Sequence, residues 1–236
     1  MESPGLFSKR DISAVTSEAV RPLLRWTYLW MIVGLVVTGV VALSINVEQV
    51  FTGPSASGLF LGAVIGEFVL VIALSWAISR LSPAVAAIMF LVYAALNGFT
   101  LSLFLYIYTG ESVALAFFIA AGTFAAMSVI GFTTDIDLTN WRTYLIVGLF
   151  GLLIAMVVNA FLQSTLFNVL ISFAGVAIFM GLTAYDTQKI KYMAASPQFQ
   201  ADGEAVAKYS IFAALQLYLD FINLFIFLLR LFGRRR

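Results

Sequence analysis

The sequence contains no cysteine and no histidine among its 236 residues. Without cysteine it can form no disulfide bond and perform no thiol chemistry, and without either residue it cannot build the nitrogen and sulfur ligand sets of zinc sites. Acid–base catalysis by histidine is excluded as well. Any metal ion would have to be bound by oxygen atoms, which favours a hard cation.

Charged residues are also scarce. They make up 11% of the chain, whereas 62% of the residues are hydrophobic and the mean hydropathy is +1.01. Soluble domains carry about 25% charged residues, so this composition indicates an integral membrane protein. The net charge of +1 gives no electrostatic reason to expect a nucleic-acid partner. The first 22 residues lack an apolar core with a cleavage site, so we expect no cleaved signal peptide.

Seven long apolar stretches indicate an all-α protein of one domain. Only a helix satisfies its own backbone hydrogen bonds within lipid, apart from closed barrels. With about 20 residues needed per crossing, we predict transmembrane helices at about 26–45, 58–79, 84–108, 112–132, 143–163, 166–187 and 209–231. The predicted organisation is a polar N-terminal arm (1–25), a seven-helix domain (26–233) and a basic tail (234–236).

The basic residues predict the orientation in the membrane. Those on one predicted side are the four in the N-terminal arm, then Arg80, Arg142, Lys189, Lys191 and Lys208. The three loops on the other side contain no Lys or Arg, so the positive-inside rule predicts a cytoplasmic N-terminus. With seven crossings, the basic residues 234–236 fall on the opposite side. Either the last helix does not cross completely, or a short basic tail is tolerated there.

Two acidic residues interrupt the last two apolar segments, GLTAYDTQKIK and LQLYLDFINLFIFLLRLFG. An acid at the centre of a membrane helix costs about 2.5–3.5 kcal/mol on insertion scales, so such residues usually have a function. We therefore predict that Asp186 and Asp220 form a paired-carboxylate site between the sixth and seventh helices. The alternative is that Asp186 lies at the membrane edge and Asp220 is a hydrogen-bonded core residue.

Further polar residues predict a path beside this pair. Gln216 and Asn223 share a helical face with Asp220, because spacings of four and three residues match the helical repeat. Such a stripe on an otherwise apolar helix is typical of a helix that faces a wet cavity inside a bundle. Glu67, in the second helix, is a third intramembrane acid; it could line an ion path or bond, protonated, to a neighbouring helix.

The motifs YDTQKIK and YLDFINLF, followed by LLRLFG, resemble the Bax inhibitor-one family, or transmembrane Bax inhibitor motif. The resemblance implies six helices around a central seventh. It also implies a pH-sensitive calcium leak channel, located in the inner membrane if the protein is bacterial. By motif, Asp186 and Asp220 match the family's paired aspartates, which contact calcium transiently. Arg80 is the nearest match to a basic residue that engages the pair, although it stands about two positions late.

The chemistry of such a pair suggests a gate. Two carboxylates in contact cannot easily both ionise, so they can share a proton and hold the two helices together. Loss of that proton would separate the helices and expose acidic oxygens to a cation. We therefore expect a passive calcium conduit that is closed at low pH and opened by deprotonation.

Two other functions of membrane proteins lack their required residues in this sequence. Tyr185-Asp186 resembles the first motif of intramembrane aspartyl proteases, but Leu217 and Leu219 stand where the second motif needs glycine. A retinal protein needs a lysine in the seventh helix, and that predicted segment has none. We therefore expect no enzymatic activity and no cofactor. The alternative that stays open is a non-transporting regulator that binds another membrane protein, such as a protease or a cell-death component.

Overall fold

The computed structural model describes residues 17–51, 56–78, 80–196 and 203–236. Most of the predicted N-terminal arm therefore lies outside the described residues. The elements in chain order are α2 (Ser17–Ser44), α3 (Val47–Phe51), α4 (Ala56–Ala77), α5 (Pro83–Ile107), α6 (Gly110–Thr133), the 3-10 turn η1 (Leu138–Asn140), α7 (Trp141–Leu162), α8 (Thr165–Ala195) and α10 (Gly203–Phe232). Seven of these helices are long and apolar enough to cross a membrane, which confirms the predicted all-α, multi-pass architecture.

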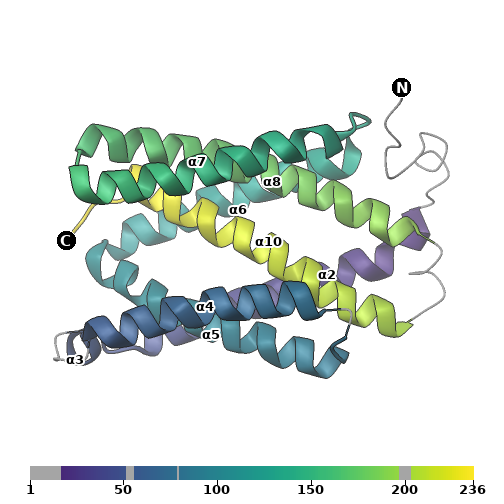
Figure 1. The fold of residues 1–236 in the computed structure, drawn as a ribbon, viewed down its shortest axis with the longest axis horizontal. Coiled ribbons are helices and arrows are strands. Elements are labelled where there is room, and N and C mark those ends of the chain that lie inside the picture. The colour runs from purple at the N-terminus through teal and green to yellow at the C-terminus, as the bar shows by residue number, and fades with distance from the viewer. Residues whose placement is uncertain (1–16, 52–55, 79, 197–202) are drawn as a thin grey trace.

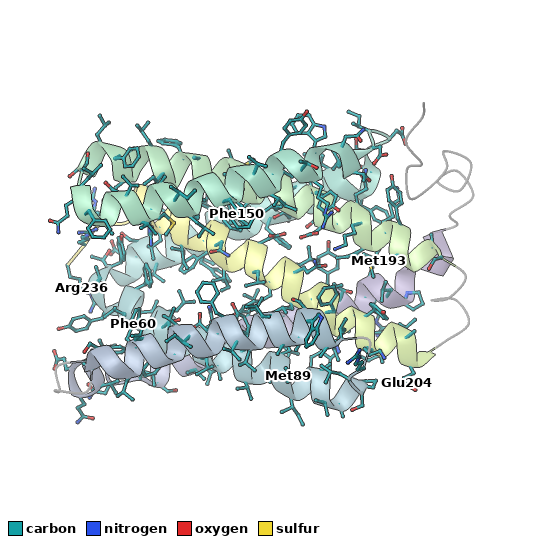
Figure 2. The ribbon with its side chains drawn as sticks, in the orientation of Figure 1. Phe60, Met89, Phe150, Met193, Glu204 and Arg236 are labelled. Atoms are coloured by element: carbon teal, nitrogen blue, oxygen red, sulfur yellow. The ribbon has the colours of Figure 1, made fainter. Side chains whose placement is uncertain are left out.

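Helix α10 is the centre of the bundle. It crosses the molecule obliquely between the other helices (Figure 1). In its most apolar stretch 72% of the residues are buried, against 11% in α4 and in α7. The outer helices instead expose large apolar side chains such as Phe150, which is 63% exposed (Figure 2). The apolar exterior is what a bilayer requires, and the buried seventh helix is the arrangement that the family resemblance implied.

The helices extend beyond the apolar stretches that predicted them. Helix α8 continues past its apolar run to Ala195, and α10 begins at Gly203, several residues before the predicted start. Helix α2 likewise begins at Ser17, inside the segment predicted as a polar arm. Hydropathy reports the part of a helix that lies in lipid, whereas a helix ends where its backbone bonding ends. The polar turns of α8 are kept helical by contacts to neighbouring elements, described below.

The C-terminal residues lie at the end of the bundle where α5 connects to α6. The backbone amide of Thr109 donates to the carbonyl of Arg234 at 3.0 Å, and the amide of Arg236 donates to the carbonyl of Ile107 at 2.9 Å. The hydroxyl of Ser112 accepts from the amide of Arg234 at 2.9 Å. Helix α10 therefore runs the full length of the bundle, and its basic tail bonds to the connection between α5 and α6.

The six outer helices pack as two groups, which α10 and the packing of α2 on α8 join. Helices α2 and α4 both pack on α5, whereas α6 and α7 both pack on α8. Small residues permit the closest approaches. A Cβ at Gly131 of α6 would collide with the backbone carbonyl of Ala184 in α8, and one at Gly98 of α5 would lie 2.6 Å from the carbonyl oxygen of Thr38 in α2. Each group is thus held by backbone-to-backbone proximity, as in other membrane helix pairs.

We predict that Gly131→Ala destabilises the protein by about 1–3 kcal/mol, because the added methyl group would force α6 away from a rigid backbone carbonyl. Gly122→Ala is the matched control on the same helix, since nothing lies within 4 Å of a Cβ there. Thermal unfolding of the two purified variants checks the prediction. Equal melting temperatures for the two variants would contradict it.

Candidate functional site

The two aspartates predicted as a pair come together between α8 and α10. Asp186 is 8% exposed and Asp220 is 4% exposed. The two side chains interact electrostatically, across two helices that pack closely against each other. Asp186 lies at the end of its predicted span (166–187) and Asp220 near the middle of its own (209–231). They meet because α10 begins early and crosses the bundle obliquely (Figure 1).

The carboxyl group of Asp220 is incompletely bonded. Its Oδ2 atom is buried and has no hydrogen-bond partner among the described residues. Most buried polar atoms in proteins are paired, and one that is not requires an explanation, such as strain, a functional role, or a bound water or ion. Here the unpaired oxygen belongs to an acid beside a second buried acid, where an added proton or cation would supply the missing interaction.

Lys189 and Arg142 are cations that interact with the pair. Lys189 lies one turn after Asp186 on α8 and interacts electrostatically with both aspartates. Arg142, at the start of α7, also interacts with Asp186. Arg80 has an exposed side chain in the turn that follows α4. Among the described residues, the cations that interact with the pair thus come from α8 and α7, and the role that the family resemblance implies for Arg80 stays a prediction.

Two of the three residues predicted to line an ion path flank Asp220 on α10. The amide oxygen of Gln216 accepts a hydrogen bond from Lys189 Nζ at 3.3 Å. The amide nitrogen of Asn223 donates to the carbonyl of Leu219 at 2.8 Å, within its own helix. Both side chains are half-buried. Together with Asp220 they form one polar stripe along the central helix.

Glu67 belongs to a different cluster. Its Oε1 accepts from the hydroxyl of Thr100 at 2.8 Å, and its Oε2 accepts from the amide nitrogen of Asn97 at 3.4 Å. Asn97 in turn accepts from the hydroxyl of Tyr218 on α10 at 3.1 Å. This network joins α4 to the central helix through α5, so Glu67 bonds to neighbouring helices and does not join the aspartate pair.

A residue that the sequence analysis did not select fixes the connection between α6 and α7. Gln188 is 1% exposed, and its amide nitrogen donates to the carbonyl of Ile136 at 2.8 Å. Its amide oxygen accepts from the backbone amide of Leu138, also at 2.8 Å. Lys191 Nζ adds a bond to the carbonyl of Phe132 at 2.8 Å. A glutamine next to other polar residues carries no sequence signal for this bidentate contact.

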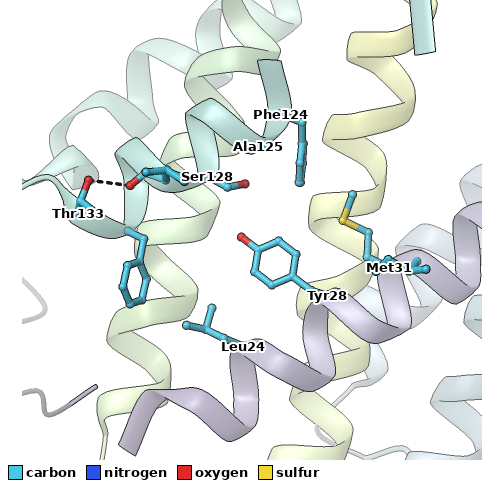
Figure 3. A pocket seen from close by; sticks show the side chains of 10 residues that line it. Leu24, Tyr28, Met31, Phe124, Ala125, Ser128 and Thr133 are labelled. Atoms are coloured by element: carbon cyan, nitrogen blue, oxygen red, sulfur yellow. Dashed lines mark hydrogen bonds between the residues drawn. The ribbon is translucent and has the colours of Figure 1, made fainter. Parts of the chain in front are cut away.

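An apolar crevice opens between α2 and α6. Its volume is about 640 Å³, and its walls include Tyr28 and Met31 of α2 and Phe124 and Ser128 of α6. The ring of Tyr28 points from α2 toward Ser128 (Figure 3). The hydroxyl of Ser128 accepts from Thr187 at 3.4 Å. Thr187 directly follows Asp186 on α8. The hydrogen bond between Ser128 and Thr187 therefore connects the wall of the crevice to the helix segment that carries Asp186.

The acidic side chains of this site are two in number. Among the described residues, no group of three or more Asp, Glu, His or Cys side chains could hold a metal ion. Calcium sites that retain their ion use six to eight oxygen ligands. The two carboxylates and the amide oxygens of Gln216 and Asn223 together reach only the lower end of that range.

The family model described as "Bax1-I: Inhibitor of apoptosis-promoting Bax1" matches residues 20–236. The chain belongs to the Bax1-I family. The match covers all seven membrane-spanning helices and includes both aspartates, which confirms the resemblance that the two terminal motifs suggested.

Several bacterial proteins are similar over most of the chain. The inner membrane protein YbhL of Escherichia coli K12 is 41% identical over 232 residues, which are 98% of this chain and 99% of YbhL. A protein of Borreliella burgdorferi is 45% identical over 208 residues, covering 87% of this chain and 89% of the relative. The protein RP147 of Rickettsia prowazekii is 42% identical over 222 residues, covering 93% and 92%.

The bidentate contact of Gln188 generates a prediction about local stability. In Gln188→Leu, the amide of Leu138 loses its acceptor, so we expect its hydrogen exchange to accelerate on the order of tenfold. Hydrogen-exchange mass spectrometry of the segment after α6 measures this. Gln49→Leu, at an exposed position of α3, should leave that exchange unchanged. Equal protection in both variants would show that Gln188 does not hold the connection.

Proposed function

We propose that this protein is a pH-sensitive calcium leak channel, gated by the aspartate pair between α8 and α10. One observation carries the proposal: the buried Oδ2 of Asp220 has no hydrogen-bond partner although a second buried carboxyl group, that of Asp186, lies beside it. Such an arrangement is complete only when a proton or a cation is present. Both states of the proposed gate are therefore defined by the same two side chains.

The direction of the pH response follows from the charges. When one proton is shared, the carboxyl groups can hydrogen-bond to each other and hold α8 against α10. When the proton leaves, two negative charges face each other in a poorly solvated place and repel. The helices then separate around an acidic, oxygen-lined opening. The leak is closed at low pH and opens as the pH rises.

The permeant ion follows from the ligand chemistry. Carboxylate and amide oxygens are the ligands that calcium prefers, and Gln216 and Asn223 supply amide groups on the same face of α10 as Asp220. Conduction needs a site that binds an ion strongly enough to admit it and weakly enough to release it. Calcium is thus the cargo of the protein, and the reaction needs neither an enzyme activity nor a cofactor.

The proposed location is the inner membrane, with the N-terminus in the cytoplasm. The similar protein YbhL is an inner membrane protein. The basic residues Arg80, Arg142, Lys189 and Lys191 lie toward the end of the bundle where α2 begins, and the positive-inside rule assigns that end to the cytoplasm. The aspartate pair would then sense cytoplasmic pH more directly than external pH.

Calcium entry into dye-loaded liposomes that contain the purified protein tests the gate. Below its midpoint, the flux should rise on the order of tenfold per pH unit if loss of one proton opens the path. In Asp186→Asn and in Asp220→Asn this pH dependence should disappear, because the one remaining carboxylate has no second negative charge to repel it.

The control for these variants is Asp135→Asn, which removes an exposed carboxylate near the same end of the bundle. It should keep the pH dependence of the unaltered protein. A pH response that survives in Asp220→Asn would refute the gate. Absence of flux above that of empty liposomes at every pH would refute the channel and favour a regulator that acts by binding another membrane protein.

Lys189 should set the pH at which the leak opens. A nearby cation favours ionised carboxylates, so in Lys189→Gln the opening midpoint should move to higher pH by about one unit or more. Lys189→Arg should largely restore the midpoint. Lys191→Gln is the matched control, because Lys191 bonds instead to the carbonyl of Phe132. A midpoint that moves equally in both glutamine variants would assign the effect to the general surface charge.

A further inference from the structure

The polar network around Glu67 has an unusual property: its hydroxyl groups each have two possible acceptors. Thr38 Oγ1 lies 2.9 Å from the carbonyl of Ala94 and 2.6 Å from the hydroxyl of Tyr218. Tyr218 lies between Thr38 and Asn97 and can donate to either. Thr100 can donate to Glu67 at 2.8 Å or to the carbonyl of Asn97 at 3.0 Å. The network can therefore be satisfied in more than one arrangement.

With Glu67 ionised, every donor points toward it. A carboxylate can only accept, and it accepts from Thr100 and from the amide nitrogen of Asn97. The amide oxygen of Asn97 then accepts from Tyr218, whose own oxygen accepts from Thr38. Each hydroxyl uses its single proton once, and the chain of donors runs from α2 through α10 and α5 to α4.

With Glu67 protonated, the same atoms can be satisfied in the reverse direction. The new hydroxyl of Glu67 needs an acceptor, which the amide oxygen of Asn97 provides if the amide group rotates by half a turn. The amide nitrogen of Asn97 then donates to Tyr218, Tyr218 donates to Thr38, and Thr38 donates to the carbonyl of Ala94. That carbonyl is at hydrogen-bond distance already, so no helix has to move.

We propose that Glu67 is a second proton-binding site of this protein. When a proton binds there, the hydrogen bonds along Asn97, Tyr218 and Thr38 reverse their donor–acceptor direction, which changes the bonding of the central helix. The proton comes from solvent and stays on the carboxyl group of Glu67. No proton passes along the chain, in which only the amide and hydroxyl groups rotate. The consequence is that Tyr218 donates to α5 when Glu67 is ionised and to α2 when Glu67 is protonated.

The surroundings of Glu67 separate this site from the aspartate pair. Two titratable side chains interact electrostatically with Glu67, namely Tyr93 on α5 and Tyr218 on α10. Tyr93 also bonds to Asn97, and as a hydroxyl it can donate or accept in either arrangement. On α3, which also packs on α4, Glu48 is exposed. The side chain of Glu67 is half-buried, near the middle of the membrane-spanning helix α4.

Infrared difference spectroscopy of the full-length protein in lipid, titrated with acid, tests the proposal without any measurement of flux. We expect a band of a protonated carboxyl group that Glu67→Gln removes. At the same midpoint we expect a shift in a tyrosine C–O band, which both Tyr218→Phe and Glu67→Gln remove. Glu111→Gln and Tyr144→Phe, at exposed positions, should retain both signals.

A third variant distinguishes a reversing chain from a merely structural contact. Thr38→Val removes the acceptor that Tyr218 needs only when Glu67 is protonated, so proton uptake should move to lower pH by about half to one unit, equivalent to one neutral hydrogen bond. A midpoint that is unchanged or higher in Thr38→Val would overturn the proposal. A shift of the tyrosine band that persists in Glu67→Gln would also overturn it. The same holds if the Glu67 carboxyl band titrates with no shift of the tyrosine band.

Discussion

The need to keep carboxyl groups away from lipid governs the whole arrangement. A helix that carries Asp220 near its middle cannot face hydrocarbon cheaply, and six other helices surround it so that its side chains meet protein. The outer helices can then be apolar on their lipid-facing sides and need few polar contacts of their own. The central position of α10 is thus a consequence of one buried acid together with the polar stripe that accompanies it.

Helix α8 distributes its polar residues among different neighbours. Its residues follow one another at about 100° around the axis, so four consecutive polar side chains point in different directions. Asp186 and Lys189 face α10, Thr187 bonds to α6, and Gln188 holds the connection that leads to α7. A movement of α8 away from α10 would therefore strain its hydrogen bonds to α6 and to the connection that leads to α7.

Much of the fold could be predicted from the sequence, because hydropathy alone identifies the segments that cross the membrane as helices. Asp186 and Asp220 could be selected because charges in apolar segments are costly. The ends of α8 and α10 could not be predicted, because polar turns remain helical when neighbouring elements provide hydrogen bonds to their side chains. Lys189 resembled an ordinary loop cation until α8 was seen to continue beyond it. Tyr218, amid leucines, gave no sign of a hydrogen-bonding role.

The crevice between α2 and α6 marks a weakly packed part of the wall of the bundle. Within the described residues, these two helices meet each other little, while each packs firmly on helices of its own group and on α10. Separating them there would sacrifice almost no van der Waals contact, whereas separating any neighbouring pair with a close backbone approach would sacrifice much. The wall of the bundle is therefore least tightly packed between α2 and α6, whereas the packing of α2 on α8 still holds the two helix groups together beside this crevice.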